Sequence, residues 1–336
     1  MIIDNIDLGK KVLIIAEVGN NHEGNFELAK QMIDQAAESG ADAIKFQTFK
    51  ADRYVTKKDE KRFQQLKGFE LSYDQFRELA SLAKKRSLIF LSTPFDLESV
   101  DALDPYVPAF KIASGDNTFL PLIKRIAQKK KPVIISTGTA DQEVIATALE
   151  TLKEYGQSKP LKDWVMLLHC VSNYPAKPEE LNLLSIRYLQ DKFDLTVGYS
   201  DHSLGIAASI VAVSCGARVI EKHFTYKKED QSFRDHLLSA DPGEFKSMVE
   251  GIRGIEILLG QYKKEPTDAE EKIKRIVRRG IAVNRLVKKG ELIEEKDIIW
   301  LRPSGEFKPG QEDLVIGKKA RRDLEESKIL EKDDIA

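Results

Sequence analysis

Short runs of apolar and β-branched residues alternate with longer segments whose apolar residues recur at spacings of three and four. Eight such runs precede residue 225, at residues 12–18, 43–49, 88–92, 110–113, 133–136, 165–171, 195–199 and 218–220. Each run is typical of a buried strand, and each intervening segment is typical of an amphipathic helix. Eight strand–helix repeats in about 250 residues are the number and size of a (β/α)8 TIM barrel. We therefore predict an α/β fold of this type.

A doubly wound open sheet is the second candidate for this pattern. Such a sheet carries a Gly-x-Gly-x-x-Gly turn after its first strand when it binds a dinucleotide. Residues 19–24 read Gly-Asn-Asn-His-Glu-Gly, which has the wrong spacing, and no acidic residue follows at the expected distance. The barrel is therefore the better prediction.

The character of the chain changes after Gly260. Residues 261–275 are dense in charge and contain Pro266, as expected of an exposed linker or a connecting helix. Residues 276–336 hold short β-prone runs, and the pattern of residues 287–298 returns weakly at residues 324–335. We predict a barrel domain at 1–260, a linker at 261–275 and, at 276–336, a small pseudo-symmetric domain in which a short βα element is duplicated. Because a domain of about 60 residues is marginally stable alone, we expect it to dock on another surface.

The composition argues against several classes of protein. Lys and Arg total 53 against 54 for Asp and Glu, so no overall basic field attracts nucleic acid or an anionic membrane. No apolar stretch approaches the about 18 residues of a membrane span, and the N-terminus does not read as a signal peptide. Cys170 and Cys215 lie in apolar segments and are expected to be reduced core thiols. We expect a cytoplasmic protein.

Polar residues follow nearly every predicted strand, at the end where a TIM barrel carries its working residues. The last two strands end in Ser200-Asp201-His202 and Glu221-Lys222-His223. Parallel strands of one βαβ unit end at the same edge, so two imidazoles and two carboxylates there indicate a divalent metal site with open positions. Histidines that only cap strand ends are the alternative. The other strand ends supply Glu17, Lys45, Gln47, Thr93, Lys111, Ser114, Asp116, Ser136, Thr137, His169, Ser172 and Tyr174.

Two lysines interrupt apolar strands, in Ile44-Lys45-Phe46 and Phe110-Lys111-Ile112. A lysine on the outer face of the barrel could extend its amine to solvent between helices. A lysine on the inner face needs an anionic partner, because an unpaired buried ammonium is too costly. Ammonium and hydroxyl groups suit a phosphate or a carboxylate, and a metal suits a polarised carbonyl. The residues therefore predict an enzyme that acts on a small anionic substrate, with a lysine Schiff-base aldolase as a rival.

The strand-end motifs resemble those of the sialic acid synthase family, which includes N-acetylneuraminate, legionaminate and pseudaminate synthases. The similar motifs run in order from the first strand to the last. They are Ala-Glu-Val-Gly-Asn-Asn-His-Glu-Gly at 16–24, Lys-Phe-Gln-Thr at 45–48, Ser-Thr-Pro-Phe at 92–95, Lys-Ile-Ala-Ser-Gly-Asp at 111–116, Ser-Thr-Gly at 136–138, His-Cys at 169–170, Tyr-Pro at 174–175, Tyr-Ser-Asp-His at 199–202 and Glu-Lys-His-Phe-Thr at 221–225. Residues 276–336 resemble the antifreeze-like (SAF) domain, a small β-clip module that ends such enzymes.

The resemblance implies a synthase that condenses phosphoenolpyruvate with an N-acyl mannosamine-type sugar, an amino-sugar aldose, and releases phosphate. The acceptor would be N-acetylmannosamine or 2,4-diacetamido-2,4,6-trideoxymannose. The resemblance also implies a domain-swapped homodimer in which each small domain covers the partner's active site. A catalytically inactive sugar-binding barrel in polysaccharide assembly is the alternative from another class of protein.

The family's functional positions map onto this sequence by motif. His202 and His223 match the ligands of a divalent metal, Mn²⁺ or Mg²⁺, and Glu17 matches a carboxylate near the reacting carbons. Asp116 and Asp235 match acidic positions that hold sugar hydroxyls, and Arg302 matches an arginine of the SAF domain that reaches the N-acyl group. Gln47 and Tyr174 are further substrate-binding candidates. The positions that match the phosphoenolpyruvate site are Lys45, Thr93, Lys111, Ser114, Ser136, Ser172 and Ser200.

Some residues depart from the sialic-type pattern. Asp116 stands where some sialic acid synthases have glutamate, and Ser172 stands where they have asparagine. Residues 51–71 form a short loop without a match to the sialic-type sugar loop. The phosphoenolpyruvate half of the site is therefore the part that the resemblance predicts most sharply.

Overall fold

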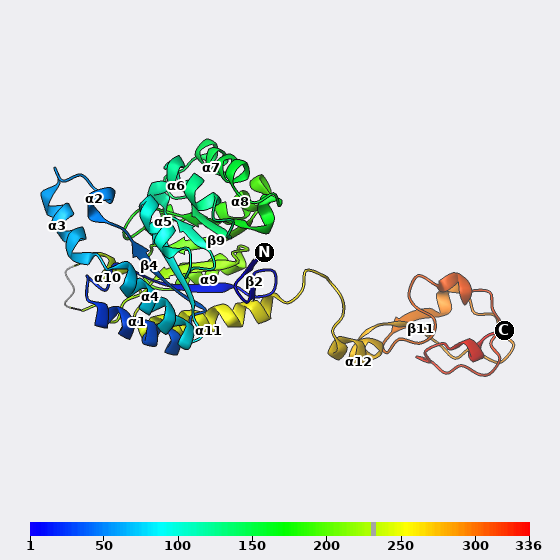
Figure 1. Ribbon diagram of the computed structural model, residues 1–336. Coiled ribbons are helices and arrows are strands. Elements are labelled where there is room, and N and C mark those ends of the chain that lie inside the picture. Colours follow the sequence, from blue (N-terminus) through cyan, green and yellow to red (C-terminus); the bar gives the residue numbers. More distant parts are fainter. Residues whose placement is uncertain (230–232) are drawn as a thin grey trace. The chain divides into compact units, whose positions relative to one another are not determined.

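The chain folds as two units, Met1–Gly260 and Gln261–Ala336, in a computed structural model that describes residues 1–229 and 233–336 (Figure 1). The first unit contains eight parallel strands in the order β5-β4-β3-β10-β9-β8-β7-β6. The strands at the two ends of this order, β5 and β6, lie side by side and complete the ring. The predicted (β/α)8 barrel is therefore confirmed.

Each predicted apolar run overlaps one strand of the barrel. The strands are β3 (Leu13–Gly19), β4 (Ala43–Thr48), β5 (Ile89–Pro94), β6 (Phe110–Ile112), β7 (Val133–Ser136), β8 (Val165–Cys170), β9 (Thr196–Asp201) and β10 (Val219–His223). The strand bodies are buried on both faces, which is why they read as continuous apolar runs instead of alternating ones.

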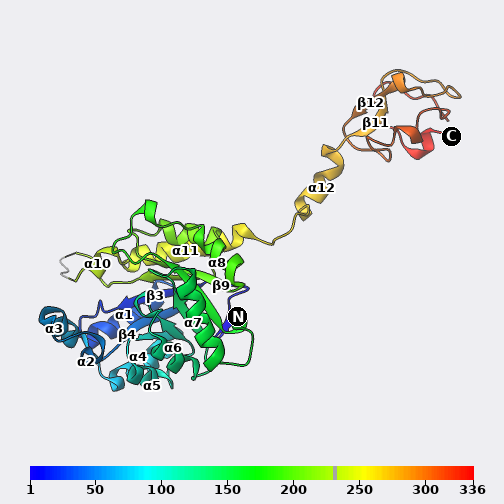
Figure 2. The same cartoon turned by 90° about the horizontal axis from the view of Figure 1, so that it is seen from above.

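Helices surround the sheet, as both views of the ribbon show (Figures 1 and 2). Several begin at side-chain caps, such as Asn25, Asp141 and the capping box of Ser72 with Gln75, which bind otherwise unpaired backbone N–H groups. Within the described residues, no helix is both long enough and apolar enough to cross a membrane. The surrounding helices are α1 (Phe26–Glu38), α4 (Tyr73–Lys85), α5 (Leu97–Leu103), α6 (Leu120–Ala127), α7 (Gln142–Tyr155), α8 (Ser185–Phe193), α9 (Ala207–Ser214) and α11 (Pro242–Leu259).

The side chains that point into the barrel change character along each strand. On β3, Leu13 and Ile15 belong to the apolar cluster inside the barrel, whereas Glu17, two residues farther on, lines a pocket. On β10, Val219 belongs to the same apolar cluster, and Glu221 lines the pocket. Because alternate residues of a strand face the same side, the barrel interior is apolar at one end and charged at the other.

A short hairpin closes the apolar end. Strands β1 (Ile2–Ile3) and β2 (Ile6–Asp7) pair antiparallel, and Ile3, Ile6 and Leu8 pack against the interior residues of the barrel strands. This end therefore has the composition of an ordinary protein core.

Three further helices lie at the charged end of the barrel. They are α2 (Ala51–Tyr54) and α3 (Glu60–Phe69), which lie between β4 and α4, and α10 (Asp235–Leu238), which follows β10.

The second unit contains α12 (Asp268–Val277) and the antiparallel pair β11 (Gly280–Val283) and β12 (Ile298–Leu301). Its weak sequence repeat has a structural counterpart, because the same 3₁₀ turn occurs at Glu295–Asp297 and at Lys332–Asp334. Each turn ends in a buried aspartate that is paired with an arginine, Asp297 with Arg285 and Asp334 with Arg322. The repeated elements are short turns and bridges instead of the βα elements that the sequence suggested.

Candidate active site

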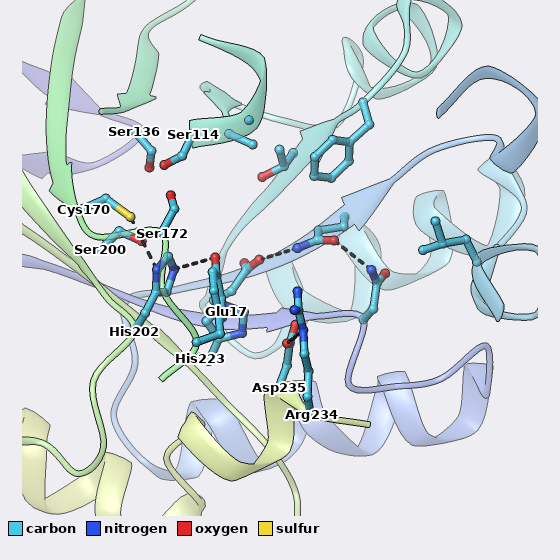
Figure 3. Close-up of a pocket in the computed structure, with 18 of the residues that line it drawn as sticks. Glu17, Ser114, Ser136, Cys170, Ser172, Ser200, His202, His223, Arg234 and Asp235 are labelled. Carbon is cyan, nitrogen blue, oxygen red and sulfur yellow. Dashed lines mark hydrogen bonds and ion pairs between the residues drawn. The ribbon is translucent and has the colours of Figure 1, made fainter. Parts of the chain in front are cut away.

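A pocket of about 780 Å³ opens at the carboxyl ends of the barrel strands. Figure 3 shows that the labelled side chains come from many strands and converge on one space. Of the residues predicted from the sequence, those that line it are Glu17, Lys45, Gln47, Thr93, Lys111, Ser114, Ser136, Ser172, Tyr174, Ser200, His202, His223 and Asp235. Asp116 follows the lining residue Gly115 but does not itself line the pocket, and Arg302 lies in the second unit, directly after β12.

Two lysines and two glutamates form a buried charge cluster at the floor of this pocket. The Lys45 ammonium lies 2.7 Å from a carboxylate oxygen of Glu17 and 3.5 Å from one of Glu221. The Lys111 ammonium lies 3.9 Å from the other carboxylate oxygen of Glu221 and donates to the Ser136 hydroxyl at 2.6 Å. The inward orientation of both lysines therefore answers the question that the sequence left open.

The four groups of this cluster differ in how readily they stay ionised. Burial raises the pKa of Glu17 to about 7, even though Lys45 acts in the opposite direction. Burial opposes the charge of Glu221 too, but Lys111 and Lys45 together hold its pKa down at about 2. Burial lowers the pKa of Lys111, whereas Glu17 and Glu221 overcome burial and raise the pKa of Lys45. Near neutral pH Glu17 readily takes up a proton, which leaves an excess of positive charge suited to an anionic ligand.

Hydroxyl groups line one side of the cluster. Lys45 donates to the Thr93 hydroxyl at 3.0 Å, and Ser200 donates to Glu221 at 2.8 Å. The Gly138 N–H donates to the Ser114 hydroxyl at 3.1 Å, and a Cβ atom at Gly138 would collide with the hydroxyls of Ser114 and Ser172. A glycine is therefore required where these hydroxyls approach the backbone. Hydroxyls and ammonium groups together form a cradle for phosphate or carboxylate oxygens.

His202 and His223 face each other across the pocket wall, with ring centroids 5.5 Å apart. His202 Nδ1 lies 2.7 Å from the Val171 carbonyl oxygen and Nε2 lies 3.0 Å from the Tyr174 hydroxyl. Among residues 1–229 and 233–336, His223 Nδ1 is buried without a hydrogen-bond partner, and burial keeps the pKa of His223 well below its usual value.

This donor set fits a divalent metal with open coordination positions. A histidine ligand commonly donates one ring N–H to a carbonyl and offers the other nitrogen, as His202 can do through Val171. The neutral His223 ring provides a second nitrogen donor. Within residues 1–229 and 233–336 no three His, Cys, Asp or Glu side chains are arranged to hold an ion. The remaining positions would therefore fall to water and substrate.

The strand-end clusters of β9 and β10 divide between two faces of the sheet. Ser200, His202, Glu221 and His223 line the pocket, as the sequence suggested. Asp201 and Lys222 are almost completely buried and do not line it, and their charged atoms lie 3.2 Å apart. Asp201 accepts from the Ser209 hydroxyl on α9, which places the carboxylate behind the sheet. The expectation of two carboxylates beside the two imidazoles is met by Glu221 and not by Asp201.

Sequence reasoning missed one wall of the pocket. It is formed by α2, α3 and the segments after β5 and β10, which contribute Tyr54, Asp59, Lys61, Arg62, Gln65, Leu66, Phe95, Phe233 and Arg234, and Asn20 adds an amide beside Gln47. The available signal was length, because 24 residues, numbers 49–72, separate β4 from α4. The segment is short beside the sialic-type sugar loop but long for a connection between a strand and the next helix, and long connections are commonly functional.

Comparison with known proteins gives consistent matches. The NeuB family matches residues 32–264, and the SAF domain matches residues 278–336. An uncharacterized protein of Methanocaldococcus jannaschii is 43% identical over 97% of this chain and 95% of its own length. The N,N'-diacetyllegionaminic acid synthase of Legionella pneumophila is 43% identical over 93% of this chain and 91% of its own length. The crystal structure of an N-acetylneuraminic acid synthetase from Leptospira borgpetersenii, in complex with citrate, has a TM-score of 0.76 and 36% identity, covering 81% of this chain and 94% of that one.

Proposed function

Because this chain belongs to the NeuB family and ends in a SAF domain, we propose that it is a nonulosonic acid synthase that joins phosphoenolpyruvate to an N-acyl mannosamine-type aldose. The observation that carries the proposal is the buried Lys45–Glu17–Glu221–Lys111 cluster at the pocket floor. Burial opposes the charge of both ammonium groups and lowers the pKa of Lys111, and a bound anion would relieve this cost.

Phosphoenolpyruvate has the required charges at both ends. Lys45, with Thr93, would hold one anionic end, and Lys111, with Ser136, would hold the other. The Ser114 and Ser172 hydroxyls at Gly138 would add donors to the phosphate oxygens. Fixing both ends orients C3 of the enol toward the acceptor, which reduces the entropy lost in the reaction.

His202 and His223 would hold the divalent metal, Mn²⁺ or Mg²⁺. A bound metal of this kind polarises a carbonyl oxygen as a Lewis acid. The His202 ring is kept in place by the Val171 carbonyl, and Tyr174 stacks on it with centroids 4.1 Å apart. These contacts orient the imidazole before any ligand arrives.

The reaction balances without a covalent enzyme intermediate. C3 of phosphoenolpyruvate attacks the open-chain aldehyde carbon, a C–C bond forms, and the aldehyde oxygen takes up a proton. Water adds to the cation that develops at C2, and the tetrahedral intermediate expels inorganic phosphate as its C2–O bond breaks. Glu17, with a pKa of about 7, is suited to exchange a proton or to stabilise the cation.

A Schiff-base mechanism would need a neutral lysine. The pKa of Lys45 is raised by Glu17 and Glu221, which keeps that amine protonated, whereas burial lowers the pKa of Lys111. Borohydride reduction of the enzyme with its substrates therefore tests Lys111 directly. We expect no mass increase on the protein, and a stable adduct at Lys111 would favour the aldolase.

The primary test measures phosphate release from phosphoenolpyruvate with Mn²⁺ and each candidate acceptor, with the product identified by mass. We expect release with at least one acceptor and none in its absence. If none of the candidate acceptors supports phosphate release, the inactive sugar-binding barrel is favoured.

His202→Ala tests the metal assignment in the same assay. We expect loss of metal-dependent turnover in a protein that still folds, although loss of the buried ring and its Val171 contact lowers the melting temperature. Full activity of His202→Ala would refute His202 as a ligand.

The homodimer and the contact of Arg302 with the acceptor stay predictions of the resemblance. Light scattering coupled to gel filtration would give the oligomeric state. The effect of Arg302→Ala on the acceptor KM would test the arginine.

A further inference from the structure

The segment between β4 and α4 forms a wall of the pocket that none of the predicted site residues belongs to. Its side chains Tyr54, Arg62, Gln65 and Leu66 line the pocket, and we name these four residues the α2–α3 wall. The wall continues the strand that supplies Lys45 and Gln47, so it stands beside the groups proposed to bind phosphoenolpyruvate.

The α2–α3 wall is held in place before any ligand binds. The Ala51 N–H donates to a Glu70 carboxylate oxygen at 2.7 Å, and the Lys50 N–H donates to Asp96 at 3.0 Å. Tyr54 packs on Phe95 with ring centroids 4.5 Å apart, and Leu66 belongs to the same apolar cluster. A binding surface that is already ordered loses little entropy when a ligand binds.

The chemistry of the wall has two parts. Tyr54, Leu66 and the adjoining Phe95 present apolar surface to the pocket. Arg62 and Gln65 present N–H donors.

A ligand that meets both parts carries a carbonyl oxygen and a methyl group close together. Asp116 lies outside this set, because it does not line the pocket.

We propose that the α2–α3 wall is the subsite that binds an acylamino substituent on the part of the acceptor remote from the aldehyde. The carbonyl oxygen of that substituent accepts from Arg62 or Gln65, and the methyl group packs on Tyr54, Leu66 and Phe95. The proposal rests on the synthase function proposed above and adds the substituent that selects the acceptor.

Other substituents match the wall less well. A hydroxyl group leaves the apolar surface of Tyr54, Leu66 and Phe95 without a partner. A phosphate group finds Lys61 and Arg62 but meets the carboxylate of Asp59 and has no apolar part. Sites that hydrogen bond a substrate group discriminate strongly against analogues that lack it, because their polar atoms are left unpaired.

Two neighbouring glutamines on α3 provide a matched test. Both Gln64 and Gln65 are exposed, but only Gln65 lines the pocket. We would measure kcat and KM of the full-length wild type, Gln65→Ala, Arg62→Ala and the control Gln64→Ala. The acceptors are 2,4-diacetamido-2,4,6-trideoxymannose, N-acetylmannosamine and N-acetylmannosamine 6-phosphate.

We expect Gln65→Ala and Arg62→Ala to lower kcat/KM for the diacetamido sugar by about 3- to 30-fold, mainly through the acceptor KM. N-acetylmannosamine, which lacks the second acylamino group, should change little, and so should the KM for phosphoenolpyruvate. Gln64→Ala should behave as the wild type with every acceptor.

Three outcomes would overturn the proposal. One is a preference for the diacetamido sugar over N-acetylmannosamine that stays unchanged in both variants. Another is an equal loss of kcat/KM for these two acceptors. The third is a loss in Arg62→Ala that is confined to the 6-phosphate, which would indicate a phosphate subsite. If phosphoenolpyruvate releases no phosphate with any acceptor, the proposed synthase function is refuted, whereas the subsite is still open to test. Ligand-observed NMR of diacetamido-sugar binding to the wild type and Gln65→Ala then decides on the subsite alone.

Discussion

The two ends of the barrel interior are built from the same strands and have opposite properties. At the amino-terminal end, Ile3 and Leu8 of the N-terminal segment pack against Leu13, Val219 and other apolar residues of the strands. At the carboxyl end, two residues beyond the apolar layer of β3 and β10, Glu17 and Glu221 lie in a cluster with two lysines. The first end stabilises the fold, whereas the second keeps charges buried at a cost in stability.

The difference follows from what each end must exclude or admit. The apolar end excludes water and gains the free energy of burying methyl and methylene groups. The charged end keeps ammonium and carboxylate groups away from water so that they interact strongly with a ligand instead. Ion pairs at such depth rarely stabilise a protein, which suggests that the cluster is kept for binding.

The largest effect that separates the two ends is expected for Lys111→Met. The substitution removes an ammonium from the proposed phosphoenolpyruvate site, and removal of one such group costs about 10²- to 10³-fold in turnover. Burial lowers the pKa of Lys111, so the folded state disfavours its charge, and Lys45 stays 3.5 Å from Glu221 after the substitution. We therefore expect a smaller loss of stability than Lys222→Met causes. Steady-state kinetics and calorimetry measure the two effects on one preparation.

Lys222→Met is the matched control for this variant. Lys222 is also buried on a barrel strand, but it pairs with Asp201 behind the sheet. Its loss leaves Asp201 buried without a cation, which costs about 3 kcal/mol in the free energy of unfolding. A Lys111→Met protein that loses stability as Lys222→Met does would contradict the division of roles between the ends.

The sequence was most informative where a pattern repeats. Eight apolar runs with helical spacers predicted the barrel because period and length are local properties that the fold preserves. The strand-end position of Lys45 and Lys111 followed from the barrel, since working residues of this fold lie there. Which way each lysine points was open, because a one-residue shift in a strand reverses the face.

The second expected effect concerns stability at the apolar end. Leu8→Ala removes a side chain that is 1% exposed and packed in the interior cluster. Such a change costs about 2–5 kcal/mol, through lost transfer free energy and the remaining cavity. Urea unfolding followed by Trp164 fluorescence in a Trp300→Phe background measures the first unit, because Trp164 is buried there and Trp300 is in the second unit.

Catalysis provides the other half of that test. At temperatures where the variant is folded, we expect kcat/KM of Leu8→Ala to equal that of the wild type. A lower kcat/KM in folded Leu8→Ala would show that the two ends are mechanically coupled.

Two features of the site could not be read from the sequence. The Asp201–Lys222 pair lies in the same motifs as His202 and His223, and only the pleat of β9 and β10 separates the structural pair from the pocket residues. The α2–α3 wall depends on long-range packing of Tyr54 on Phe95, which no local periodicity records. The sequence showed its residues only as a short loop without a match to the sialic-type sugar loop.

The smallest effect is a difference in how stability depends on pH. Burial raises the pKa of Asp116 to about 6, although Lys111 acts in the opposite direction. Because this pKa lies above the ordinary value of 3.8, the folded state prefers the protonated acid. Its contribution to stability is complete below pH 3.8 and is lost as the pH rises through about 6.

Asp116→Asn removes this titration, so the stability of the wild type relative to the variant should fall between pH 4 and pH 7. The side chain is partly exposed, and we therefore expect only about 1–2 kcal/mol. Unfolding curves across that range measure it, with Leu8→Ala as the reference, whose loss of stability should be the same at every pH. A wild type and Asp116→Asn that differ by a constant amount would mean that Asp116 is not held at an elevated pKa. Asp116 would then carry its charge at little cost in stability, and the contrast between the two ends would rest on the lysine cluster alone.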